Sequence, residues 1–314
     1  MSWLSADRLR LVVPALSLAL LLGAVFWMQP RTMSYTGLNL LFNLAVPIAL
    51  ATIAQMLIMT VNDLDLSMGT FVSFVACVTA TFLQSDPLIG VLILIGCVAT
   101  YAALGVVIYL RNLPSIVVTL GMSFVWGGLA VLLLPSPGGV APDWIRWLMT
   151  SKPPVLPMAI VASVAIAAVA HFIVMRSAFG VVIRGVGGNE RSVERAGWSV
   201  LKARAATYAL AGCFAVMAGI CLVGLTTSAD ANIALRYTLL SIAGVILGGG
   251  EFVGGRVSPI GAVIGALTLT LAGSFLSFLR IPPDWQIGAQ GAILIIVLAV
   301  RLLLNRRERA ERSR

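Results

Sequence analysis

The stretch Leu88–Tyr109 reads LIGVLILIGCVATYAALGVVIY and contains no charged residue. About 20 apolar residues in a helix span the hydrocarbon core of a bilayer, because a helix satisfies its own backbone hydrogen bonds. Similar runs recur along the 314-residue chain. The sequence therefore predicts an all-α, polytopic membrane protein, a helical bundle of about ten transmembrane helices. The ten apolar segments are residues 11–28, 38–61, 67–84, 88–109, 115–134, 155–175, 204–226, 237–249, 257–279 and 286–304.

The composition excludes a water-soluble protein. Hydrophobic residues make up 60% of the chain and charged residues only 11%, against about 25% charged residues in soluble domains. The mean hydropathy is +1.02. The net charge of +9 could indicate a nucleic-acid partner, but the basic residues of cytoplasmic loops explain it better. The four cysteines lie inside apolar runs, so we expect small buried residues rather than disulfides or metal ligands.

Basic residues set the orientation. If the chain starts in the cytoplasm and crosses ten times, 16 of its 21 Lys and Arg residues face the cytoplasm. Removing one helix would place a basic terminus outside, so we expect both termini to be cytoplasmic. The first apolar run has no cleavage site after it, which favours an uncleaved helix. The basic tail at residues 305–314 is expected to face anionic membrane lipid.

Two long connections interrupt a single transmembrane domain that covers residues 1–314. The first, at residues 135–154, is expected on the outer, periplasmic side. It contains Trp144 and Trp147, whose spacing suits an amphipathic helix at the membrane surface. The second, at residues 176–204, is expected in the cytoplasm.

The cytoplasmic connection contains the signals for a short helix. Asn189 is a good N-cap, Glu190 suits the positive end of the helix dipole, and Gly197 provides a left-handed end. These residues predict a helix at 190–196, with Gly187 and Gly188 ahead of it. A helix of two turns is unstable alone and must dock on something. The alternative is a solvated basic loop.

A second polar segment, NDLDLSMGT, spans Asn62–Thr70 between two apolar runs. Carboxylates at membrane depth are costly and usually face protein or water. We interpret Asp63 and Asp65 as caps in cytoplasmic interfacial water, with Asp65 or Ser67 capping the next helix. The alternative is a position inside the protein, on a transport pathway. Gly69 would let two backbones approach closely.

A third segment, Ala243–Ala266, is rich in glycines spaced four apart. This spacing favours close packing of membrane helices. The alternative is a broken or re-entrant helix that lines a pathway, since the segment 237–249 is short. The glycine pairs are Gly244 and Gly248, Gly250 and Gly254, and Gly261 and Gly265.

These three segments together resemble the ribose-type family of ABC sugar-importer permeases. The resemblance extends over residues 62–266, and the cytoplasmic segment is the most diagnostic part. The departures are Val193, Trp198, and Asn62 and Asp63 in place of two glycines. The implied ATPase-coupling residues are Gly187, Gly188, Asn189, Glu190, Arg191, Arg195 and Gly197. The implied pathway or packing residues are Asp65, Ser67, Gly69, Gly248, Gly249, Gly254 and Gly255.

The resemblance implies a permease subunit in the bacterial inner membrane that forms the translocation path for ribose or a related monosaccharide. The implied partners are a second permease chain, identical or related, a cytoplasmic ABC ATPase that binds ATP and magnesium, and a periplasmic sugar-binding protein. In the family, the short cytoplasmic helix fits into a groove on the ATPase.

The chain itself is expected to have no cofactor, no metal site and no enzymatic activity. It lacks a phosphate-binding loop of the type G-x-x-x-x-G-K-[ST] and the common hydrolase motifs. The alternatives are an ion-coupled secondary transporter of a small polar solute, which would need the two aspartates, and a related ABC permease for a non-sugar substrate.

Overall fold

The computed structural model describes residues 6–282, 285, 288, 291 and 292. Within this part the regular secondary structure is helical, and an isolated β-bridge joins Gly138 to Ala229. The elements in chain order are α1 (Ala6–Met28), η1 (Pro30–Met33), α2 (Tyr35–Asn43), α3 (Ala45–Thr60), α4 (Met68–Phe82), α5 (Pro87–Arg111), α6 (Ser115–Leu133), α7 (Asp143–Thr150), α8 (Met158–His171), η2 (Phe172–Arg176), α9 (Ala178–Arg195), α10 (Val200–Thr226), α11 (Tyr237–Leu247) and α12 (Pro259–Phe278).

Six helices in the described part are long and apolar enough to cross a membrane. They are α2 with α3, α5, α6, α8 with η2, α10 and α12. The apolar part of α1 and the helices α4 and α11 are shorter. The segments predicted at 67–84 and 237–249 are therefore helices of 15 and 11 residues, too short to span a core of about 30 Å alone. The predicted segment 286–304 lies outside the described residues.

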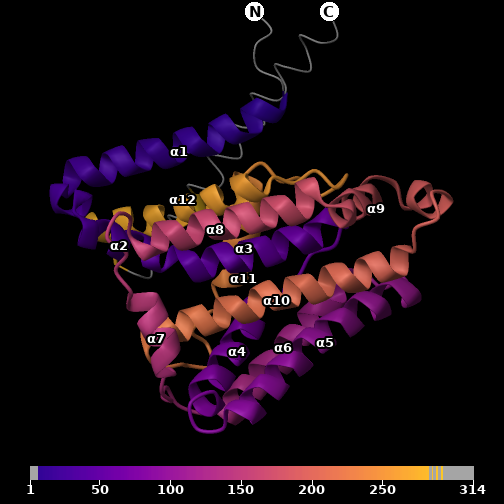
Figure 1. Cartoon of the computed structure of the whole chain (residues 1–314), viewed down its shortest axis with the longest axis horizontal. Helices are drawn as coiled ribbons and strands as arrows, with labels where there is room; N and C mark the ends of the chain where they lie inside the picture. Colours follow the sequence, from indigo (N-terminus) through magenta and orange to yellow (C-terminus); the bar gives the residue numbers. More distant parts are fainter. Residues whose placement is uncertain (1–5, 283–284, 286–287, 289–290, 293–314) are drawn as a thin grey trace, which may run out of the picture.

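The helix α3 forms the centre of the molecule. All 16 of its residues are buried. It packs against α10 on one side and against α8, α11 and α12 on others, as Figure 1 shows. A helix that is apolar all round belongs in an interior, because every face then needs an apolar neighbour. The short α4 is also largely buried, between α6 and α10.

The outer helices present apolar side chains to their surroundings. On α5 and α6 the exposed residues include Leu92, Ile95 and Phe124. This is the arrangement expected where lipid rather than water covers the helices. Cys213 on α10 is exposed as well, so the expectation that all four cysteines are buried was wrong. In a membrane an apolar residue needs no protein cover.

The two long connections lie at opposite ends of the molecule (Figure 1). The first carries α7, with Ile145 and Met149 buried and Trp144 and Trp147 exposed, which confirms the amphipathic helix. The second carries α9 at the other end. The end of α3 and the start of α10 pack against α9, and Asn62 connects Gly187 of α9 to Gly254. This end therefore gathers parts of the three polar segments, whereas α4 begins against the stretch before α11.

Candidate functional site

The helix α9 is bent in the middle. Asn189 has extended backbone angles (φ −161°, ψ 101°), and its side-chain oxygen accepts a hydrogen bond from the Ser192 amide at 3.3 Å. Gly197, just beyond the helix, has a φ of +85°. The predicted N-cap and left-handed end are both present. The residues ahead of Asn189 are also helical, whereas we expected a glycine-containing loop there, so two helical arms meet at the bend.

The second arm, residues 190–196, carries the exposed face of this site. Arg191, Arg195 and Trp198 are exposed, and Val193 is buried. A shallow hollow of about 440 Å³ lies between the two arms, with Val181, Gly188 and Trp198 in its lining. Tyr109 of α5 donates a hydrogen bond to the Glu194 carboxylate at 3.0 Å. The second arm therefore has one face fixed to the bundle and one face free.

Three segments that are distant in sequence meet beneath this arm. Gly187 packs so closely that a Cβ there would overlap the Thr60 carbonyl oxygen and lie 2.8 Å from the Gly255 Cα. The Asn62 amide donates to the Gly187 carbonyl at 2.7 Å and accepts from the Gly254 amide at 3.0 Å. We call residues 62–63, 187–190, 204 and 254–255 the cytoplasmic junction.

An arginine links the junction electrostatically. Arg204, at the start of α10, forms an ion pair with Asp63 at 2.6 Å and a second with Glu190. Tyr208 donates a hydrogen bond to the same Asp63 oxygen at 3.0 Å. The Asp63 and Arg204 side chains are only 10% and 12% exposed. The interpretation of Asp63 as a cap in interfacial water was therefore wrong, because a cation and a hydroxyl group compensate its burial.

Asp65 is also buried, and completely so. Its carboxylate accepts hydrogen bonds from the Ser67 amide, the Ser67 hydroxyl and the Tyr101 hydroxyl, each at 2.7 Å. Burial raises the pKa of the Asp65 carboxyl, and the hydrogen bonds from Tyr101 and Ser67 oppose this rise. The interfacial position expected for Asp65 was therefore also wrong. The carboxylate instead closes the turn that leads into α4 and ties it to α5.

The glycines of the second and third segments permit backbone contacts. A Cβ on Gly69 would lie 2.6 Å from the Leu235 carbonyl oxygen. Gly248 lies directly against the Gly261 backbone. In the irregular stretch after α11, three glycines adopt a positive φ, with values of 95°, 93° and 64° at Gly249, Gly254 and Gly255. Gly248 and Gly69 thus pack helices together, whereas Gly254 and Gly255 belong to the junction.

Three residues of this site escaped the sequence reasoning. Arg204 was counted only as a cytoplasmic cation, and Tyr101 and Tyr208 were treated as parts of apolar runs. The available signal was a hydroxyl group or a charge inside an otherwise apolar helix, which needs a buried partner. The partners themselves lie 36 and 145 residues away from the tyrosines.

Comparison with known proteins supplies the family context. A family model described as the permease component of the branched-chain amino acid transport system matches residues 37–298. The probable ABC transporter permease protein YphD of Escherichia coli is 30% identical, over 84% of this chain and 80% of its own. The ribose import permease protein RbsC of Escherichia coli is 24% identical, over 91% of each chain. The autoinducer 2 import system permease protein LsrC of Escherichia coli is 27% identical, over 92% of this chain and 86% of its own. No solved structure matches.

Proposed function

Because the chain belongs to this family of transport-system permease components, we propose that it is the membrane-spanning subunit of an ATP-driven importer of a monosaccharide. The family and the apolar helices make it a multi-pass protein of the inner membrane, a transport component rather than an enzyme. The ribose and autoinducer 2 permeases among its relatives support a sugar-like substrate. The proposed topology has ten membrane-embedded segments, of which α4 and α11 are too short to span the bilayer alone, and two cytoplasmic termini.

The observation that carries the proposal is the construction of α9. Its second arm offers an exposed face with Arg191 and Arg195, and Trp198 just beyond the arm lies beside them at the hollow between the arms. A groove on a cytoplasmic ATPase would bind this face. The exposed aromatic ring of Trp198 is suited to act as a hydrophobic anchor in that groove. ATP and magnesium belong to that partner, because this chain has no phosphate-binding loop.

The cytoplasmic junction gives the arm a rigid connection to the pathway helices. Movement of the ATPase would pull on residues 190–196. Through Asn62, Asp63 and Arg204 this displacement would reach the ends of α3 and α10. Through Gly254 and Gly255 it would reach the stretch between α11 and α12. Coupling then needs no long-range signal, because the contacts of the cytoplasmic junction reach α3, α10, α11 and α12 directly.

Two further partners complete the proposed assembly. A second permease chain, identical or related, would form the other half of the pathway. A periplasmic sugar-binding protein would dock at the outer end, where α7 presents Trp144 and Trp147. The lipid bilayer surrounds the apolar outer helices, and no nucleic acid is part of this proposal.

The test is co-purification of the tagged chain from detergent-solubilised membranes, followed by mass spectrometry. A near-stoichiometric ABC ATPase is expected with the wild type. The double variant Glu190→Ala, Arg195→Ala should reach the membrane in normal amounts but lose sugar uptake while ATP hydrolysis continues. The Arg31→Ala variant, in η1, is the control for the loss of an exposed arginine elsewhere. Normal uptake by the double variant would contradict the coupling role of α9.

A different substrate is the second candidate, because the family description names branched-chain amino acids. Uptake by the reconstituted complex, with labelled ribose and labelled leucine compared side by side, separates the two. The ion-coupled alternative is less well supported, because Asp63 and Asp65 are both occupied by protein partners. Transport by the chain alone without ATP would favour it.

A further inference from the structure

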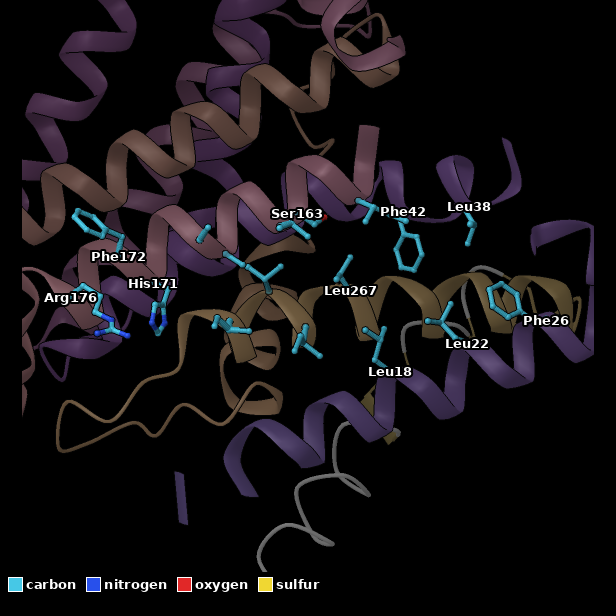
Figure 2. Close-up of a pocket in the computed structure, with 17 residues that line it drawn as sticks. Leu18, Leu22, Phe26, Leu38, Phe42, Ser163, His171, Phe172, Arg176 and Leu267 are labelled. Atoms are coloured by element: carbon cyan, nitrogen blue, oxygen red, sulfur yellow. The ribbon is translucent and has the colours of Figure 1, made fainter. Parts of the chain in front are cut away.

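An apolar groove runs between α1 and α8. It has a volume of about 780 Å³, within the range of ligand sites in proteins. Figure 2 shows α1 along one side and α8 along the other, with side chains from α12 between them. Leu18, Leu22 and Phe26 line it from α1, and Phe42 and Leu267 from α2 and α12. Such a lining offers no hydrogen bonds to a sugar, so the groove is unsuited to the transported substrate.

One end of the groove differs from the rest. His171 and Arg176 lie there together, pointing to the same side in Figure 2. The π-helical turn η2 at Phe172–Arg176 explains this, because a turn that closes after five residues brings positions five apart onto one face. The remaining polar residue of the lining, Ser163, donates its hydroxyl to the Ala159 carbonyl at 2.7 Å.

Arg176 is exposed at this end, and no carboxylate among the described residues lies within ion-pair distance of it. It stands at the start of the 176–204 connection, which leads to α9, whereas α7 lies at the opposite end of the molecule (Figure 1). In the proposed orientation the cationic end is therefore at the cytoplasmic surface. Basic pockets between helices on that side suit anionic lipid headgroups.

We propose that this groove binds an anionic phospholipid of the cytoplasmic leaflet. Its acyl chain would lie along the leucines and phenylalanines of α1, α2 and α12. Its phosphate would accept two parallel hydrogen bonds from the Arg176 guanidinium, and a third from the His171 ring. The complementarity is twofold: an apolar channel that matches a hydrocarbon chain, and, where the phosphate would be, an arginine that forms no ion pair with a carboxylate of the described residues.

The bound lipid would fill the space between α1 and α8, which both pack on α12. The anionic-lipid content of the membrane would thus affect how α1 packs against the other helices. This inference is independent of the transported substrate and of the ATPase. It depends only on the membrane location and the orientation of the chain.

The test is native mass spectrometry of the full-length chain after delipidation in detergent. Phosphatidylglycerol and phosphatidylcholine with identical acyl chains are titrated separately. We expect one phosphatidylglycerol to bind with about tenfold preference, equivalent to about 1.4 kcal/mol. Arg176→Gln should abolish the preference, and Ala168→Trp, a larger side chain at an exposed lining position, should weaken binding of both lipids.

Arg146→Gln is the matched control, since it removes an exposed arginine at the opposite end and should leave the preference unchanged. Size-exclusion profiles identical to the wild type establish that each variant is folded. Equal binding of the two lipids by the wild type would overturn the proposal, as would an undiminished preference in Arg176→Gln. Exclusion of both lipids because a second copy of the chain fills the groove would also overturn it.

Discussion

Replacement of Arg204 with methionine removes the cation that Asp63 and Glu190 share. Asp63 would then be a nearly buried carboxylate with the Tyr208 and Ser115 hydroxyl groups as its remaining partners. Breaking a buried ion pair from one side costs about 3–5 kcal/mol. Because Tyr208 still donates and the pair is slightly exposed, we expect Arg204→Met to lower the free energy of unfolding by about 2–3 kcal/mol.

Glu190 provides the matched comparison on the same arginine. Its side chain is 38% exposed, so solvent screens its share of the interaction. Glu190→Gln should lower the free energy of unfolding by less than about 1 kcal/mol. The double variant Asp63→Asn, Arg204→Met should be less destabilised than the sum of its single variants, with a coupling energy of about 1–3 kcal/mol.

The assay is unfolding in mixed micelles with increasing sodium dodecyl sulfate, followed by tryptophan fluorescence. The wild type, the three single variants and the double variant are compared in the same lipid and detergent. The reasoning fails if Arg204→Met costs no more than Glu190→Gln. It also fails if the Asp63 and Arg204 substitutions are additive, because the two charges would then not form a pair in the folded protein.

Two glycine pairs give further predictions. Gly187→Ala should abolish uptake and reduce the folded yield, because the new Cβ would overlap the Thr60 carbonyl oxygen. Gly188→Ala should be tolerated, since the nearest atom to its Cβ is 4.0 Å away. Uptake and the size-exclusion yield are measured for each variant. Gly248→Ala should destabilise the protein by about 1–3 kcal/mol through overpacking, whereas Gly96→Ala, with open space around it, should leave the unfolding midpoint unchanged or slightly raised. Equal effects within either pair would show that the backbones are not in contact there.

Local chemistry explains which features the sequence could predict. The apolar runs gave the helices, because length and hydropathy alone decide whether a segment suits a bilayer. The N-cap at Asn189 and the end at Gly197 followed from capping rules that involve neighbouring residues only, whereas the helical arm ahead of Asn189 did not. The close approach at Gly69 was also predictable, since a residue without Cβ is the usual means of bringing backbones together.

The partners of the buried charges could not be predicted in this way. Asp63 pairs with a residue 141 positions away, and Asp65 with a tyrosine 36 positions away. Nothing in the local pattern around either aspartate identifies these partners, so the aspartates resembled interfacial caps. The burial of α4 and α11 inside the bundle could not be predicted either, because an apolar helix suits a lipid environment and a protein interior equally well.

The hydrogen bonds of Asn62 have a consequence for synthesis of the chain. One connects it to Gly187 and the other to Gly254, which is 192 residues further along. At about 5–20 residues per second, a ribosome needs roughly 10–40 s to cover that distance. Throughout this interval the end of α3 is already made but lacks its final neighbour. The cytoplasmic junction is therefore completed late, and a chain truncated before the glycine stretch would present unpaired polar groups to quality-control proteases.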